Sequence, residues 1–213
     1  MKQIDPASLI DVQDLADDNG IAMKSLPVYA GNDNFLGEAI YRPNTRILLH
    51  KDLANIVVAA ADRMYRMRGM RFILTDGLRT IEAQERMLRA QKTLENPQWL
   101  EQQMLSKPGH GGHPRGMAVD IMLEHKDGRP VNMGTALDDM SPASARDYQD
   151  LPKDVLDSRK FLELFMREEA EKQNQKILPL PSEWWDFRLL PEVYEQYAPL
   201  SDDDLPDFMR MSL

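Results

Sequence analysis

The sequence has no cysteine, only four histidines and no long apolar run. The absence of cysteine excludes disulfide bonds, thiolate zinc sites and cysteine nucleophiles. The net charge of −9 gives an acidic surface that repels phosphate backbones, so no nucleic-acid partner is expected. No stretch approaches the length of a membrane span. The N-terminal segment contains several aspartates and does not fit a signal peptide, so we expect a cytoplasmic protein, or a periplasmic one if a leader has been removed.

The composition is that of a folded globular domain. Apolar residues make up 42% of the 213 positions and charged residues 29%, a balance that supports a packed core. A chain of this length is expected to form a single domain over residues 1–213. We expect its core at residues 25–195 and an acidic C-terminal tail over residues 196–213, of which the last dozen residues, with their DDDLPD run, are expected to be loosely held.

Hydrophobic periodicity predicts an α+β fold with a small sheet. Apolar residues recur at three- and four-residue steps over residues 51–68, which predicts a helix that Gly69 ends. A second helix is expected over 80–94, with Thr80 as its cap. The other expected elements are strands over 71–75 and 117–123, a short helix after Asn96-Pro97 whose Trp99, Leu100 and Met104 face the core, a helix over 158–175, and two short extended pieces within 176–190.

Asp120 is an acid in an apolar setting. Its neighbours in Met117–Leu123 read as a buried strand, where an ionised carboxylate is costly unless a cation, a hydrogen-bond network or a metal compensates it. His113 lies seven residues earlier, and Gly116 between them can let the loop fold back. A shared metal site is therefore one interpretation, and the other is that Asp120 caps a loop or pairs with Arg115.

Two further segments carry groups suited to such a site. In Ser182–Phe187, strand alternation separates Glu183 from Asp186, and a local twist or bulge is needed to bring both to one site. The alternative is a tryptophan-rich core strand edged by surface acids. In Thr75–Thr80, Arg79 follows a strand end and a turn, from which it can reach into a cleft or lie on the surface.

Together these segments resemble the D-Ala-D-Ala dipeptidase family of zinc peptidases, which is related to zinc D,D-carboxypeptidases and to the Hedgehog signalling-domain fold. Five matches occur in the family's order: Asp33–Gly37 with DNF-x-G, Asp76–Arg79 with D-G-Y-R, His113–Asp120 with H-x-x-G-x-A-x-D, Met133–Asp138 with M-G-T-x-F-D, and Glu183–Trp185 with the start of E-W-W-H. They cover roughly residues 25–190, and five ordered matches are far more specific than one. The resemblance implies a small, mainly antiparallel central sheet flanked by helices.

The resemblance also implies a role for each matched residue. His113 and Asp120 would be zinc ligands, and Glu183 the general base that takes a proton from the attacking water. Arg79 would stabilise the scissile carbonyl as it becomes an oxyanion, and Asp138 would pair with the free ammonium of a dipeptide. The implied activity is metal-dependent hydrolysis of short D-amino-acid peptides of the cell wall, foremost D-Ala-D-Ala.

One departure concerns the third metal ligand. The family has a histidine after E-W-W, whereas this sequence has Asp186. A carboxylate can also bind zinc, so His113, Asp120 and Asp186 are the predicted ligands, in a more anionic set that shifts preference towards manganese or iron. Two alternatives stay open: His110 completes the site, or the metal is lost and the chain binds cell-wall fragments or a protein partner without catalysis.

Smaller departures lie near the expected substrate. Gly111 stands where the family usually has serine, and Leu78 replaces the aromatic residue of the D-G-Y-R turn. The resemblance therefore specifies peptidase chemistry more firmly than a preference for D-Ala-D-Ala, and it leaves the oligomeric state open. His50 and His125 are expected to be surface or loop residues.

Overall fold

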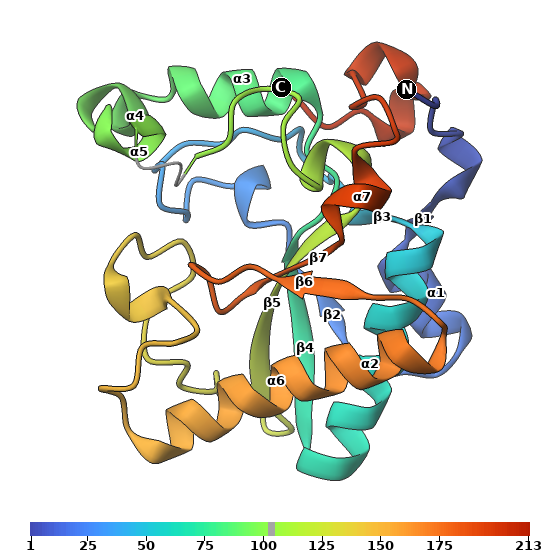
Figure 1. The fold of residues 1–213 in the computed structure, drawn as a ribbon. Helices are drawn as coiled ribbons and strands as arrows, with labels where there is room; N and C mark the ends of the chain where they lie inside the picture. Colours follow the sequence, from blue (N-terminus) through green and yellow to red (C-terminus); the bar gives the residue numbers. More distant parts are fainter. Residues whose placement is uncertain (102–104) are drawn as a thin grey trace.

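The computed structural model describes residues 1–101 and 105–213, and a five-stranded sheet lies at its centre (Figure 1). The strands, in spatial order, are β2 (Lys24–Ser25), β4 (Met70–Asp76), β5 (Ala118–His125), β7 (Asp186–Leu189) and β6 (Ile177–Pro179). β2 and β4 are parallel, and the other three neighbouring pairs are antiparallel. The predicted α+β class with a small, mainly antiparallel sheet is confirmed.

A separate pair of short strands precedes the first long helix. β1 (Leu9–Asp11) and β3 (Leu48–His50) are antiparallel. His50 is also the N-cap of the helix that follows, where its Nδ1 accepts a hydrogen bond from the Asp52 N–H at 3.4 Å. This histidine is only 6% exposed, so the expectation of a surface or loop residue is wrong. The first N–H groups of a helix lack intrahelical acceptors, so the His50 ring finds a hydrogen-bond partner while it is buried.

Two long helices pack with the sheet. α2 (Lys51–Arg68) has the predicted span, and Gly69 ends it at a φ of 67°. α6 (Lys153–Lys172) begins and ends earlier than the predicted 158–175. Its first turn follows an extended Pro152 and includes the fully buried Val155, so apolar burial starts the helix earlier than expected. Figure 1 shows α6 crossing in front of the sheet with α2 beside it.

The remaining helices are short: α1 (Val12–Asp18), α3 (Ile81–Arg89), α4 (Gln91–Glu95), α5 (Gln98–Glu101) and α7 (Pro191–Tyr194). The helix predicted over 80–94 is divided, because Ala90 is extended (ψ 142°) between α3 and α4. Thr80 is at the N-cap position of α3, but its side chain makes no capping hydrogen bond. Trp99 packs against the core as expected, whereas Met104 lies outside the described residues.

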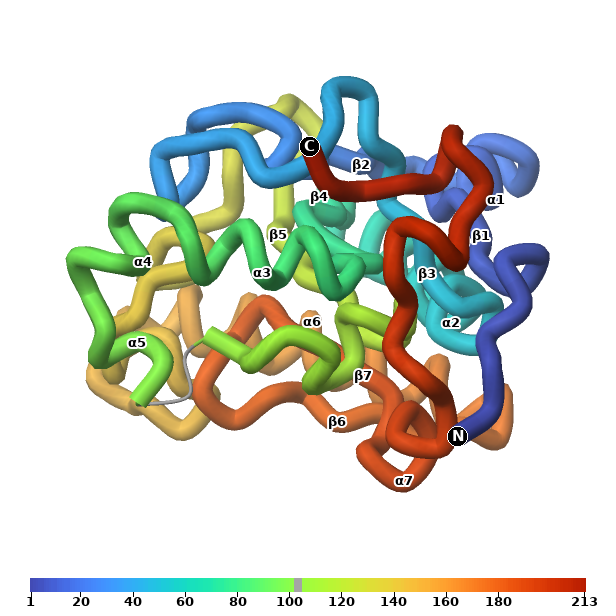
Figure 2. The backbone as a smooth tube through the Cα atoms, turned by 90° about the horizontal axis from the view of Figure 1, so that it is seen from above, coloured from blue at the N-terminus to red at the C-terminus, as the bar shows by residue number. Residues whose placement is uncertain are grey.

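The C-terminal segment is packed, so the expected loose tail over 196–213 is wrong. Its buried apolar residues are Leu200, Leu205, Met209 and Met211. The Asp202 carboxylate is also buried, because it accepts hydrogen bonds from the N–H groups of Met211 (2.7 Å) and Ser212 (3.0 Å). Figure 2 shows this segment running over the body of the molecule.

Residues before position 25 also contribute to the packed core. Their buried apolar side chains are Ile4, Leu9, Val12, Ala16 and Met23.

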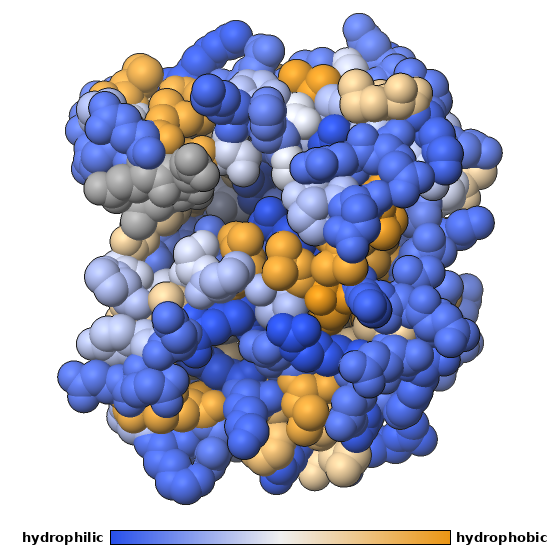
Figure 3. Space-filling view, viewed as in Figure 1, coloured by the Kyte–Doolittle hydropathy of each residue, from blue (hydrophilic) through white to orange (hydrophobic). Residues whose placement is uncertain are grey.

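The face seen in Figure 3 is mostly hydrophilic, with a hollow between the α3–α5 region and the strands. Within the described part of the chain, no helix combines the length and apolar character needed to cross a membrane.

Candidate active site

Three carboxylates lie side by side on neighbouring strands. Asp76 ends β4, Asp186 begins β7, and Asp120 lies in β5 between them. In the strand register Asp120 is the partner of both Asp76 and Asp186. Directly opposite residues on adjacent strands share one face, so the register alone brings the three acids together. Each is at most 3% exposed.

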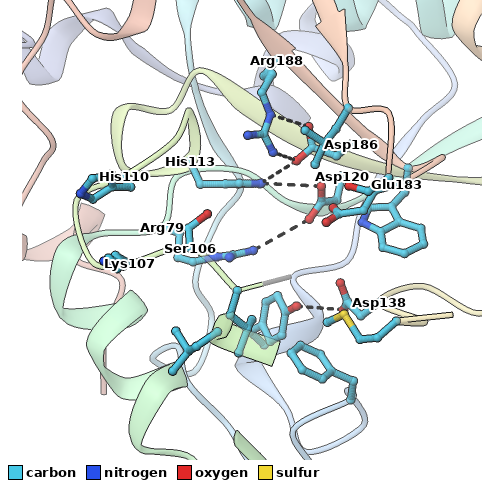
Figure 4. A pocket seen from close by; sticks show the side chains of 18 residues that line it. Arg79, Ser106, Lys107, His110, His113, Asp120, Asp138, Glu183, Asp186 and Arg188 are labelled. Atoms are coloured by element: carbon cyan, nitrogen blue, oxygen red, sulfur yellow. Dashed lines mark hydrogen bonds and ion pairs between the residues drawn. The ribbon is translucent and has the colours of Figure 1, made fainter. Parts of the chain in front are cut away.

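The acids of β5 and β7 lie on a cleft with a volume of about 610 Å³. The cleft is lined by every residue that received a role from the sequence: Arg79, His113, Asp120, Asp138, Glu183 and Asp186. Figure 4 shows their side chains converging from loops and strands that are far apart in the chain. The residues that the sequence predicts for the site therefore line one cleft in the folded chain.

His113 is fixed by the turn that follows it. The turn His113–Arg115 ends at Gly116, which has a φ of 62° and lets the chain fold back into β5. The His113 Nδ1 lies 2.7 Å from the Gly77 carbonyl oxygen, an acceptor, so Nδ1 is the donor in this hydrogen bond. Nε2 is the ring nitrogen on the side of the carboxylates. It lies 3.7 Å from Asp120 Oδ1 and 3.4 Å from Asp186 Oδ2.

Asp120 carries an uncompensated oxygen. No described residue donates a hydrogen bond to its buried Oδ1. Burial, together with the charges of Asp186 and Asp76, raises the pKa of Asp120 well above its usual range. The alternative pairing with Arg115 is absent, because that guanidinium donates to the carbonyl oxygens of Tyr197, Gly109 and Gly111. A buried acceptor without a donor is the feature that a cation would complete.

Asp186 is held by an arginine from its own strand. Arg188 Nε donates to Asp186 Oδ1 at 2.8 Å, and Arg188 Nη2 donates to Oδ2. Burial opposes ionisation, but Arg188 and the nearby His113 outweigh it, so the pKa of Asp186 lies well below its usual range. Asp186 therefore stays anionic while it faces Nε2 of His113.

Asp76 has a similar pairing with Arg79. Arg79 Nε donates to Asp76 Oδ2 at 2.9 Å, and the hydroxyl of Tyr41 donates to Asp76 Oδ1 at 2.6 Å. The N–H of Gly77 donates to the same Oδ1 at 2.9 Å. Arg79 Nη2 also lies 3.9 Å from Asp120 Oδ2. Asp76 thus anchors the arginine beside the candidate metal site, a role that the D-G-L-R motif contains but that sequence reasoning did not assign.

Glu183 reaches the cleft from the turn before β7. The strand begins only at Asp186, so strict alternation does not apply to Glu183 and both acids line the cleft. Burial, reinforced by the charge of Asp186, raises the pKa of Glu183 to about 8. The turn is anchored by Trp184, whose Nε1 donates to Thr135 Oγ1 at 2.8 Å and whose N–H donates to the Ser144 carbonyl oxygen.

Asp138 lies on a loop that is clamped from α6. Its φ of 57° is in the left-handed region, and its Oδ2 accepts a hydrogen bond from the Tyr29 hydroxyl at 2.8 Å. Burial raises the pKa of Asp138 to about 6, although the Tyr29 hydrogen bond acts to lower it. Arg159 donates to the carbonyl oxygens of Met133 and Ala143 on either side of this residue, which fixes the loop at both ends.

The residues present suit a divalent metal. One potential ligand atom from each of Asp76, His113 and Asp120 lies within 4.8 Å of the others, and Asp186 Oδ2 is closer still to His113 Nε2. The oxygens of Asp76 accept hydrogen bonds from Tyr41, Gly77 and Arg79. Those of Asp186 accept from Arg188 alone among the described residues, so Asp186 is the less heavily bonded third carboxylate. His110 lines the cleft but is exposed, and Figure 4 shows its ring apart from Asp120.

A family model described as D-ala-D-ala dipeptidase matches residues 5–203. The chain belongs to this peptidase family. It is 28% identical over 185 residues to the D-alanyl-D-alanine dipeptidase of Escherichia coli, which covers 87% of this chain and 86% of that protein. Among solved structures, the L-Ala D-Glu endopeptidase ChiX of Serratia marcescens has a TM-score of 0.40 and 18% identity, over 68% of this chain and 84% of that one. Membership of the dipeptidase family supports a hydrolase with a peptide substrate.

Proposed function

We propose that the chain is a metal-dependent dipeptidase that hydrolyses short peptides containing D-amino acids, with D-Ala-D-Ala as its preferred substrate. The observation that supports this best is the buried group formed by His113, Asp120 and Asp186. In it Asp120 Oδ1, which accepts no hydrogen bond from a described residue, lies 3.7 Å from the Nε2 of His113. A buried carboxylate oxygen without a donor, beside an imidazole nitrogen and a second carboxylate, is complementary to a divalent cation.

We assign His113, Asp120 and Asp186 as the ligands and zinc as the metal. When bound, the metal would supply Lewis acidity and a water whose pKa falls to about 7. Asp76 is left out because Tyr41, Gly77 and Arg79 already occupy its oxygens. Two carboxylates make the ligand set harder than a histidine-rich one, so manganese or iron is the alternative metal.

Glu183 and Arg79 would carry out the proton transfer and the charge stabilisation. Glu183 would accept a proton from the attacking water and pass it to the leaving amine. A pKa of about 8 suits a group that accepts and releases a proton near neutral pH. Arg79 would stabilise negative charge on the carbonyl oxygen, and its guanidinium is already oriented by Asp76.

Asp138 would bind the free ammonium of the peptide. Its carboxylate is buried on the cleft and is oriented by the Tyr29 hydroxyl. A carboxylate in this position favours a cationic group of the substrate, and the ammonium in turn favours the ionised form of Asp138.

The ion pair between Asp186 and Arg188 favours a second candidate function. A carboxylate that is already satisfied by a guanidinium needs no metal. In that case the chain would bind cell-wall fragments or a protein partner without hydrolysing them.

Metal analysis and peptide hydrolysis test the two candidates. For a dipeptidase we expect the purified protein to retain a divalent metal and to release D-alanine from D-Ala-D-Ala in a chelator-sensitive reaction. Absence of bound metal, together with no cleavage of D,D-, L,D- or D,L-dipeptides, contradicts the proposal. If the native chain is inert and Asp186→His gains both metal and activity, the binding function is supported.

The role of Glu183 is tested by Glu183→Gln, which removes the base but keeps the shape of the side chain. We expect kcat to fall by about 10²–10⁴-fold, the usual contribution of a general base, while metal content and melting temperature stay unchanged. Ser182→Ala, at the neighbouring lining residue, is the matched control. Loss of metal in parallel with activity would make Glu183 a structural residue.

A further inference from the structure

Arg188 has one edge that its ion pair does not use. Nε and Nη2 both donate to Asp186, whereas no acceptor among the described residues is paired with Nη1. The side chain lines the cleft and is 12% exposed. A guanidinium carries five N–H donors, so the Asp186 pair leaves donors free for a ligand in the cleft.

This free edge borders a space left by Gly111. A Cβ atom added there would lie 3.7 Å from Arg188 Nη1 and 3.8 Å from Ser106 Oγ, with no other neighbouring side chain within 4 Å. Gly111 has a φ of 86°, a conformation that glycine adopts without strain. Two hydrogen-bond donors from separate segments, Arg188 Nη1 and Ser106 Oγ, therefore border the space that the missing side chain of Gly111 leaves open.

The cleft carries opposite charges on its two sides. Arg188 lies near Gly111, and both Arg188 and Asp138 line the cleft. Figure 4 shows Arg188 and Asp138 on opposite sides of the His113–Asp120 pair. A ligand that spans the candidate metal site therefore meets an anionic group at one end and a cationic group at the other.

We propose that Arg188 Nη1 and Ser106 Oγ form a subsite for the free α-carboxylate of the bound peptide. The proposal rests on the dipeptidase function above and assigns the recognition of its second charged end. N⁺–H···O⁻ hydrogen bonds are shorter and stronger than neutral ones, and the planar guanidinium suits a carboxylate better than an ammonium does. With Asp138 on the ammonium, the subsite fixes the direction of a zwitterionic dipeptide and disfavours peptides extended or amidated at the C-terminus.

The test compares D-Ala-D-Ala with its C-terminal amide. We expect the wild-type chain to prefer the free acid in kcat/KM by about 10–100-fold, the range given by loss of a hydrogen bond to a charged group. Ser106→Ala and Arg188→Gln should each reduce this preference, mainly through the KM of the acid. Because Arg188→Gln also removes the partner of Asp186, metal content is measured, and the acid-to-amide ratio is compared rather than the rate.

Lys107→Gln is the matched control, because it removes an exposed cation of the same cleft without changing Arg188 or Ser106. The preference should survive this change. Equal handling of acid and amide by the wild type overturns the subsite, as does an effect of Lys107→Gln as large as that of Arg188→Gln.

If the wild type cleaves neither peptide, the dipeptidase function has failed, and calorimetric binding then decides the subsite. Acid-selective binding that Arg188→Gln abolishes supports it. Equal or absent binding of the two peptides overturns it.

Discussion

The two strands that flank β5 each bring a carboxylate paired with an arginine, yet the two pairs leave different groups open. In the pair from β4, Tyr41 and Gly77 also donate to Asp76, so neither carboxylate oxygen is free. In the pair from β7, Arg188 donates to both oxygens of Asp186, and Oδ2 also lies 3.4 Å from the Nε2 of His113. Asp76 therefore holds Arg79 in place through several hydrogen bonds, whereas Asp186, with one donor residue and a neighbouring imidazole, is the carboxylate that we propose as the metal ligand.

The largest expected effect on metal affinity is at Asp120, which lies on β5 between the Asp76–Arg79 and Asp186–Arg188 pairs. Asp120→Asn should lower zinc affinity by more than the roughly 10–100-fold that loss of an outer-shell partner costs. The physical reason is that the unpaired Oδ1 is the acceptor that a cation would complete. Calorimetric titration of metal into the metal-free protein measures the change, and unchanged affinity would remove Asp120 from the ligand set.

The comparison itself is tested by Asp186→Asn against Asp76→Asn. We expect Asp186→Asn to weaken zinc binding by at least about 10-fold, whereas Asp76→Asn should retain the metal. Asp76→Asn should instead lower kcat, because Arg79 loses the anchor that orients it. Metal content and kcat, measured together for both variants, separate these outcomes. A loss of zinc on Asp76→Asn that exceeds the loss on Asp186→Asn would reverse the assignment.

The pH dependence of stability follows from the raised pKa values. In the metal-free protein, burial raises the pKa of Asp138 to about 6 and that of Glu183 to about 8. A carboxyl group whose pKa is higher in the folded state stabilises the fold below its unfolded pKa, and this stability is lost as pH rises through the folded value. The metal-free protein should therefore become less stable between about pH 4 and pH 8.

Urea unfolding across this range, with and without zinc, measures the slope. Glu183→Gln should flatten its upper part, because the amide does not ionise. An unchanged slope in this variant would mean that Glu183 is not the group that titrates.

The smallest expected effect is at Tyr41, whose hydroxyl donates a hydrogen bond to Asp76. Tyr41→Phe removes one hydrogen bond and should lower the free energy of unfolding by about 0.5–1.5 kcal/mol. Zinc affinity should not change, because Asp76 is outside the proposed ligand set. Urea unfolding and metal titration on the same protein provide both readouts.

The fold class was predictable from local patterns, whereas the members of the candidate site were predicted from the resemblance to a known family together with those patterns. Periodicity predicted α2, and the apolar surroundings of Asp120 predicted a buried acid in a strand. The pairing of Asp120 with both Asp76 and Asp186 was not predictable, because strand register depends on contacts between distant segments. Arg188 was missed for a related reason, since its position two residues after Asp186 is informative only once that strand is known to border a cleft.

The predictions for the C-terminal segment and for His50 were wrong because polar or charged residues there are buried in the structure. The DDDLPD run suggested a solvated tail, but Asp202 accepts hydrogen bonds from the returning backbone, and the apolar residues that follow it pack inward. His50 was expected at the surface because a polar residue between apolar segments gives no sign that it will cap a helix.

The packed C-terminus has a consequence for how the chain can be handled. The carbonyl oxygen of Met211 accepts a hydrogen bond from the N–H of Arg42, next to Tyr41, and the hydroxyl of Tyr41 in turn holds Asp76. Variants that lack Met211 would lose this hydrogen bond, and the hold of Tyr41 on Asp76, which orients Arg79, would weaken. Any activity measured on such variants would reflect this change at the candidate site.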